Sequence, residues 1–386
     1  ESIHVIYGSA TPRQDGRPYN SAIVLGPDGK EITRYHKLVP EGWFEPGDHL
    51  ALFAVDGIPC TLMICHDERY PEIVRIPAIA GARVCFYLSY EVNSLASALR
   101  KMEGYRAQLI ARAAENNVWI VQANGIGPLP GDPGALSLGY SRIVDPGGLV
   151  IKEAPGMVEA VNVEDLIPAA ASRRNAQKSL DIVPLKGWWR ASLEEAKFAG
   201  GGPVAAAAAP APPAVPATPT PPAPPAVPSP PKQTKVRLAL LKAVPVQWDL
   251  EGNFKVFLKL LEEAGREKLD LFVTPEGWLD GYAAADKACT PEKLLSVAQD
   301  LETSPYLKLV AAEAQQRSIY VCFGFTSLKN GRPYNTAGLW GPDGKRVGLY
   351  HKTHLQEHDL QFAPGDRLPV WPTPWGPTGI MICADR

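Results

Sequence analysis

Hydrophobic residues along this chain fall into two alternating patterns, short continuous runs and repeats at helical spacing. Apolar positions 254, 257, 258 and 261 recur as on one face of a helix, and longer helical patterns cover 304–316 and 95–117. A further helix is predicted to begin near Tyr70. Strand-like runs alternate with these helices, which predicts an α/β layered fold. The predicted strands are 84–88, 118–123, 236–243, 269–274, 319–324 and a buried strand within 376–382, and a hairpin is predicted around 145–148.

One stretch interrupts this alternation. Residues 200–231 consist largely of Ala and Pro, as in "AAAAAPAPPAVPATPTPPAPPAVPSPP". Such a composition cannot form a packed core and predicts an extended, semi-rigid polyproline II linker. The linker divides the chain into two segments, 1–199 and 232–386.

The two segments share a long repeat. Residues 2–49 align with residues 318–367 with small gaps, and the match continues from "GIPCTLMICHDERY" in the first segment to "GPTGIMICADR" in the second. The first segment begins where the second is about half complete, and the second stops where the first has half its length to come. We therefore predict that 1–199 is the C-terminal part of one domain and 232–386 the N-terminal part of a second copy, both truncated.

Composition and charge narrow the class of partner. The chain has 386 residues, a formal net charge of −2 and 45% hydrophobic residues, which indicates a globular protein with a small-molecule partner. Neither a basic nucleic-acid surface nor a polybasic membrane surface is indicated, and no apolar run reaches about 18 residues. Six scattered cysteines without a Cys-x-x-Cys pair favour reduced thiols over disulfides or a zinc site, which fits the cytoplasm.

Two cysteines stand where a strand should end. Cys65 closes the apolar run "TLMIC" and is followed by "HDERYPE", and Cys383 stands in the same context. At a turn from strand to helix, a thiol can be exposed beside backbone N–H groups that face an oxyanion. A buried core cysteine is the alternative for either residue taken alone. The other four cysteines have no such polar exit and are interpreted as core or incidental: Cys60, Cys85, Cys289 and Cys322.

Two lysines and a glutamate are candidates to act with these thiols. Lys37 and Lys352 each follow Tyr-His, just after a Gly-Pro-Asp-Gly-Lys turn signal. A lysine beside a thiol would lower the pKa of the thiol and stabilise an oxyanion, although a lysine taken alone is ordinarily solvated. Glu276 ends a predicted strand in "FVTPEGWLDGY". It could cap the next helix, or take the thiol proton, pass it to a leaving amine and later activate water.

As a set, these residues resemble the nitrilase, or carbon–nitrogen hydrolase, superfamily, whose members use a Glu, a Lys and a Cys in that chain order. Further similar phrases are "RAAENNVWIVQANGIG" and "GYSRIVDPGG", and the resemblance covers nearly everything outside the linker. It implies a four-layer α-β-β-α sandwich that assembles into dimers or larger oligomers. It also implies hydrolysis of small linear amides or N-carbamoyl amines through a cysteine thioester, without a metal or organic cofactor.

The resemblance also assigns a role to each candidate. The general base falls at Glu276, the oxyanion-stabilising lysine at Lys352 and Lys37, and the nucleophile at Cys383 and Cys65. This is the order in which the superfamily uses these residue types.

A second glutamate positions substrate in many members. It falls at Glu41 in "PEGWFEPGD" and at Glu357 in "QEHDLQFAPGD". The first segment has no counterpart of Glu276, because the strand that should carry it would precede Glu1. The second segment lacks the helix expected after its nucleophile. We therefore expect neither copy to be competent alone.

Three kinds of alternative stay open at this point. Residues 236–316 supply what the first segment lacks, so the halves could combine into one circularly permuted domain that uses Glu276, Lys37 and Cys65. The same residues could instead hydrolyse nitriles or transfer an acyl group to an amine. A non-catalytic assembly module that keeps the fold is a rival from a different class.

Overall fold

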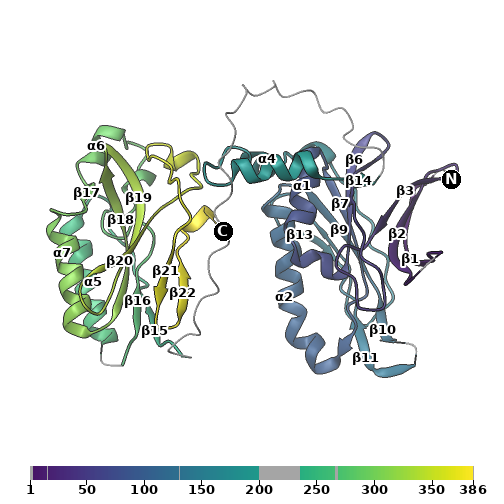
Figure 1. Ribbon diagram of the computed structural model, residues 1–386, viewed down its shortest axis with the longest axis horizontal. Helices are drawn as coiled ribbons and strands as arrows, with labels where there is room; N and C mark the ends of the chain where they lie inside the picture. Colours follow the sequence, from purple (N-terminus) through teal and green to yellow (C-terminus); the bar gives the residue numbers. More distant parts are fainter. Residues whose placement is uncertain (1–2, 15, 130, 200–234, 266–267, 386) are drawn as a thin grey trace. The chain divides into compact units, whose positions relative to one another are not determined.

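The computed structural model describes residues 3–14, 16–129, 131–199, 235–265 and 268–385. These residues form two compact units, which are drawn from purple to teal and from green to yellow in Figure 1. Among the described residues, the first unit comprises 3–14, 16–129, 131–181 and 185–199, and the second comprises 182–184, 235–265 and 268–385. The predicted linker, 200–231, lies outside the described residues. No helix in the described part of the chain is both long and apolar enough to cross a membrane.

The first unit stacks two helices and two sheets in three layers (Figure 1). The larger sheet has the order β13-β12-β9-β7-β6-β5, and β6, β7 and β9 run parallel. Helices α1 and α2 cover one face, and an antiparallel sheet of β1, β2 and β3 covers the other. The bounds are β1 Val5–Thr11, β2 Tyr19–Leu25, β3 Glu31–His36, β5 Phe53–Val55, β6 Ile58–Ile64, β7 Val84–Ser89, β9 Trp119–Asn124, β12 Arg142–Val144, β13 Val150–Glu153, α1 Glu72–Ala80 and α2 Leu95–Ala114.

Strand β6 shows how the sequence builds these layers. Because successive side chains of a strand point to opposite faces, Leu62 and Ile64 pack toward β2 and β3 while Met63 packs toward the helices. All three side chains are buried. This strand leads directly into the turn at Cys65.

Shorter elements complete the first unit. Strands β10, β11 and β8 form an antiparallel sheet, and β14 pairs with β4. The bounds are β4 Leu50–Ala51, β8 Asn93–Ser94, β10 Ile126–Leu129, β11 Asp132–Leu138, β14 Phe198–Ala199, α3 Arg174–Lys178, α4 Lys186–Glu195 and the 3-10 turns η1 Cys65–Arg69 and η2 Pro168–Ala170.

The second unit is built on one mixed sheet. Strands β15, β16 and β18 run parallel, β18, β19 and β20 run antiparallel, and β17 pairs with β18. Helices α5 and α7 pack on one face, and the hairpin β21–β22 lies beside the other (Figure 1). The bounds are β15 Leu238–Leu240, β16 Leu271–Val273, β17 Gln299–Asp300, β18 Tyr320–Lys329, β19 Arg332–Trp340, β20 Arg346–His351, β21 Val370–Thr373, β22 Gly376–Gly379, α5 Leu250–Ala264, α6 Pro291–Leu295, α7 Pro305–Arg317, and the 3-10 turns η3 Ala283–Ala285, η4 Glu357–Asp359 and η5 Cys383–Asp385.

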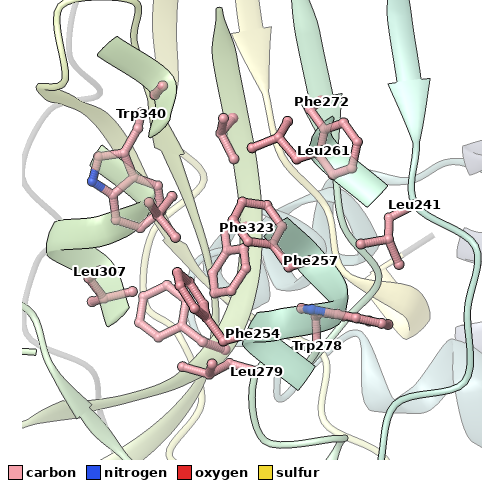
Figure 2. Close-up of a cluster of buried hydrophobic side chains, with 14 of the residues drawn as sticks. Leu241, Phe254, Phe257, Leu261, Phe272, Trp278, Leu279, Leu307, Phe323 and Trp340 are labelled. Carbon is pink, nitrogen blue, oxygen red and sulfur yellow. The ribbon is translucent and has the colours of Figure 1, made fainter. Parts of the chain in front are cut away.

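Aromatic side chains dominate the core between this sheet and α5. Figure 2 shows Phe254 and Phe257 of the helix packed around Phe323 of β18. The ring centroids of Phe257 and Phe323 lie 5.0 Å apart in an edge-to-face arrangement, which aromatic pairs favour. Helix α5 begins with a side-chain cap, because Asp249 accepts a hydrogen bond from the backbone N–H of Gly252.

Most predicted elements are confirmed, with one correction. The helices at 95–117 and 304–316 appear as α2 and α7, and the hairpin at 145–148 joins β12 to β13. The predicted buried strand within 376–382 is wrong in part: β22 ends at Gly379, is half-exposed and pairs with β21. Its counterpart β6 is held by β7 on one side, and the described residues of the second unit offer no such partner. The four-layer sandwich and the domain boundaries stay predictions.

Truncating Phe257 should destabilise the second unit strongly. F257A removes a fully buried ring and leaves a cavity, so we expect a loss of about 3–5 kcal/mol in the free energy of unfolding. V256A, on the exposed side of the same helix, should cost about 0.5 kcal/mol or less. Urea unfolding of both variants gives the comparison, and equal losses would contradict this packing.

Candidate active site

Both candidate nucleophiles occupy the same unusual backbone turn. Cys65 opens η1 with φ 46°, and Cys383 opens η5 with φ 47°. A left-handed conformation is uncommon for a residue with a side chain and costs of order 1–3 kcal/mol. The surrounding contacts must therefore hold each turn in place.

An aspartate two residues after each cysteine provides those contacts. In the second unit, Asp385 accepts hydrogen bonds from the Tyr350 hydroxyl at 2.7 Å, the Ile382 N–H at 2.9 Å and the His354 N–H at 2.8 Å. Tyr350 lies in β20 one residue before its end, and His354 stands two residues after Lys352. The carboxylate thus ties the cysteine turn to the loop that carries the lysine.

The first unit repeats this arrangement. Asp67 accepts from the Tyr35 hydroxyl at 2.8 Å, the Ile64 N–H at 3.0 Å and the Val39 N–H at 3.1 Å. Burial raises the pKa of Asp67, although the three hydrogen bonds oppose that shift. Two distant parts of the sequence therefore build the same support for a cysteine.

Lys352 lies at the centre of a buried ion cluster in the second unit. Its side chain is fully buried, and Nζ lies 2.8 Å from Glu276 Oε1 and 2.6 Å from Asp359 Oδ2. Burial alone would lower the pKa of Lys352, but the hydrogen bonds to Asp359 and Glu276 outweigh it and raise the pKa. The lysine is therefore an ammonium held between two carboxylates.

Glu276 and Cys383 complete this cluster. Asn335 Nδ2 donates to Glu276 Oε1 at 2.7 Å, which gives that oxygen two donors with Lys352. The pKa of the Cys383 thiol is raised, first by burial and then by the negative charge of Glu276, while the charge of Lys352 lowers it. The structure thus brings Glu276, Lys352 and Cys383 within electrostatic reach of one another.

The first unit joins Lys37 and Glu41. Lys37 is fully buried and its Nζ lies 2.6 Å from Glu41 Oε1. Burial raises the pKa of Cys65 to about 11, and nearby carboxylates including Glu41 add to the rise. Lys37 lowers the pKa as expected from the sequence, but this effect is the smaller one. The expected low thiol pKa is therefore not found.

Asp359 is the residue that sequence reasoning missed. Glu357, the candidate for substrate positioning, is exposed on η4, whereas the carboxylate on Lys352 is that of Asp359. Asp359 also accepts from the Tyr282 hydroxyl at 2.6 Å. The repeat held the signal: Glu41 stands six residues before Gly47, and Asp359 stands six residues before the matching Gly365.

One group of side chains has donors suited to a metal. A carboxylate oxygen of Glu41, the sulfur of Cys65 and a ring nitrogen of His66 lie within 4.8 Å of one another. However, the Glu41 oxygen nearest His66 also accepts from the Lys37 ammonium. A cation bound there would lie against that positive charge, so we assign no metal to this group.

Behind Cys65, buried polar residues form a connected network. The Tyr87 hydroxyl donates to Glu68 Oε2 at 2.6 Å and lies 3.3 Å from the Cys65 carbonyl oxygen. Burial raises the pKa of Glu68 to about 7. Glu91 extends the network toward a hollow that Tyr105 and Arg142 also line.

The fold and the site define a mixed α/β protein with two cysteine turns, each supported by an aspartate and accompanied by a buried lysine–carboxylate pair. The model of the carbon-nitrogen hydrolase family matches residues 1–175 and 237–386. The chain belongs to the carbon–nitrogen hydrolase family.

Individual relatives match part of the chain. It is 31% identical over 187 residues to the 2-oxoglutaramate amidase of Bacillus subtilis, covering 47% of this chain and 69% of that protein. It is 34% identical over 179 residues to the (R)-stereoselective amidase of a Pseudomonas species, covering 45% and 61%. The crystal structure of an amidase from Nesterenkonia aligns at 24% identity with a TM-score of 0.35, covering 40% of this chain. The chain spans 57% of the length of that structure.

Removing the charge of Asp359 should destabilise the second unit. D359N leaves the buried Lys352 with one carboxylate fewer, so we expect a loss of about 3–5 kcal/mol in the free energy of unfolding. The ion pair lowers the pKa of Asp359, so its contribution is present above the unfolded value of about 3.9 and is lost as the pH falls through the lower folded value. Urea unfolding at neutral and acidic pH measures both effects.

E357Q is the matched control, because Glu357 lies on the same turn but is exposed. It should change the free energy of unfolding by about 0.5 kcal/mol or less at either pH. A loss in E357Q as large as that in D359N would show that the ion cluster is not the main support of this loop.

Proposed function

We propose that this chain hydrolyses carbon–nitrogen bonds of small linear amides through a thioester on Cys383, with Glu276 as the base and Lys352 as the oxyanion stabiliser. The observation that carries the proposal is the 2.8 Å contact between Lys352 Nζ and Glu276 Oε1, with the thiol of Cys383 under the influence of both charges. A base, a nucleophile and a fixed positive charge at one point are what acyl transfer from an amide requires.

The first step forms the thioester. The Cys383 thiol gives its proton to Glu276 as its sulfur attacks the amide carbon, and the carbonyl oxygen becomes an oxyanion beside Lys352. Glu276 then passes the proton to the amide nitrogen. The carbon–nitrogen bond breaks, ammonia or an amine departs, and the acyl group stays on sulfur.

Water completes the cycle. Glu276 takes a proton from water, the resulting hydroxide attacks the thioester carbon, and the second oxyanion again lies beside Lys352. Collapse breaks the carbon–sulfur bond and releases a carboxylic acid, while the proton returns to Cys383. A raised thiol pKa suits this scheme, because the thiol keeps its proton until substrate arrives.

The substrate class rests on the relatives. Two of them are named as amidases, one for 2-oxoglutaramate and one for its (R)-stereoselectivity. We extend amide hydrolysis to this chain, with N-carbamoyl amines as a related substrate class. Under this proposal Asp359 anchors Lys352, and Glu41 does the same for Lys37 while facing the substrate side of Cys65.

Cys65 and Lys37 are not part of the reaction that we assign to Cys383. Their counterpart of Glu276 is not found among the described residues of the first unit, where the carboxylate bound to Lys37 is Glu41. We therefore assign the reaction to Cys383 first. Use of Glu276 with Lys37 and Cys65 in a permuted domain stays a prediction.

Replacing Glu276 should lower amide turnover and, at the same time, let the Cys383 thiol ionise at lower pH. E276Q removes the base, so amide turnover should fall by about 100- to 10,000-fold. It also removes the negative charge that raises the pKa of Cys383, so the thiolate should form at lower pH than in the original chain. Ammonia release and thiolate absorbance measure the two effects, and E292Q, at an exposed position on α6, is the control.

The two effects have opposite signs, which makes the result specific. An E276Q chain that keeps its turnover would refute Glu276 as the base. A Cys383 thiolate that forms at unchanged or higher pH would show that Glu276 does not act on this sulfur.

A further inference from the structure

Asn335 contacts both charged partners in the second unit. It lies in β19 with 2% of its surface exposed, and its Nδ2 donates to Glu276 Oε1 at 2.7 Å. Its backbone carbonyl accepts from the Lys352 N–H at 2.8 Å. One residue therefore touches the backbone of the lysine and the carboxylate of the glutamate.

The amide oxygen of the Asn335 side chain destabilises the fold. Its Oδ1 is buried and has no hydrogen-bond partner among the residues that the structure describes. An unsatisfied buried acceptor costs about 1–3 kcal/mol, which an apolar side chain would avoid. Turning the amide over would direct this oxygen at the Glu276 carboxylate, an acceptor facing an acceptor. The orientation of the amide therefore follows from Glu276, and packing alone gives no reason for a polar residue here.

We propose that Asn335 is a positioning residue that holds Glu276 Oε1 together with Lys352, so that Oε2 is left to take the proton of Cys383. The inference rests on the proposed function. The amide keeps both of its protons throughout, and only the thiol proton moves.

The repeat supplies a matched position for comparison. Asn20 stands in "RPYNSA" as Asn335 stands in "RPYNTA", and its carbonyl accepts from the Lys37 N–H at 2.8 Å. The backbone contact to lysine is thus common to both units. Asn20 is only half-buried, whereas the Asn335 amide is buried against Glu276.

The test is the pH dependence of thiol labelling in the full 386-residue chain. Iodoacetamide is the probe, and peptide mass spectrometry gives the rate at each cysteine for the unmodified chain, N335A, N335D and N20A. A thiol without a base loses about tenfold in rate per pH unit below its pKa. A thiol whose proton is taken by Glu276 should instead lose less than tenfold per pH unit. Cys65 is the internal reference in every sample.

We expect Cys383 labelling in N335A to fall more steeply as the pH falls, toward about tenfold per pH unit, because Glu276 is then no longer held to take the thiol proton. N335D should give at least as steep a fall, because a second carboxylate replaces the donor. N20A should leave the Cys383 profile unchanged. If a thermal melt shows that N335A is not folded, N335D serves as the test variant, because it keeps the volume of the side chain.

Two results would overturn the inference. The first is a slope of Cys383 labelling against pH that is unchanged in both Asn335 variants, and the second is a change by one factor at every pH, as a packing defect would give. If Cys383 of the unmodified chain already loses about tenfold per pH unit, the proposed function fails with it. If Cys383 of the unmodified chain loses less than tenfold per pH unit and both Asn335 variants do the same, only the proposed role of Asn335 is refuted.

Discussion

A buried ammonium that must be neutralised is the constraint on which the second unit depends. Lys352 is fully buried, and an unpaired charge in that position would cost several kcal/mol. Glu276 follows β16 and Asp359 lies on η4, so two segments far apart in the sequence must meet at one nitrogen. Neutralisation of the Lys352 ammonium thereby fixes the position of Glu276, the base that the proposed chemistry needs.

A second constraint acts on the backbone of the two candidate nucleophiles. Cys65 and Cys383 both adopt a left-handed turn, and an aspartate holds each turn through a tyrosine hydroxyl and two backbone N–H groups. The same contacts arise in both units, and each aspartate reaches a tyrosine and a loop that the repeat carries earlier in the chain. Reactivity then depends on what else lies near the sulfur, and there the units differ: Glu276 in one, Glu41 and His66 in the other.

The sequence predicted the periodic elements well. Helices α2, α5 and α7 could be predicted from apolar spacing, because the residues that form the buried face of each helix lie within one continuous stretch of the sequence. The prediction from sequence failed where strand pairing decides whether a strand forms, and where burial decides the pKa of a thiol. The segment after Gly379 is as apolar as β6 but lacks a described strand like β7 beside it, and the pKa of Cys65 is raised because burial outweighs Lys37. Asp359 was missed because a short insertion hides its match to Glu41.

The account depends most directly on an acyl group forming on one particular sulfur. Incubating the chain with a small amide, quenching in acid and mapping the cysteine peptides by mass spectrometry measures it. We predict that the acyl mass lies on the peptide that contains Cys383 and is removed by hydroxylamine, as a thioester would be. Acylation spread equally over Cys383 and Cys289, or found on neither, would contradict the central claim.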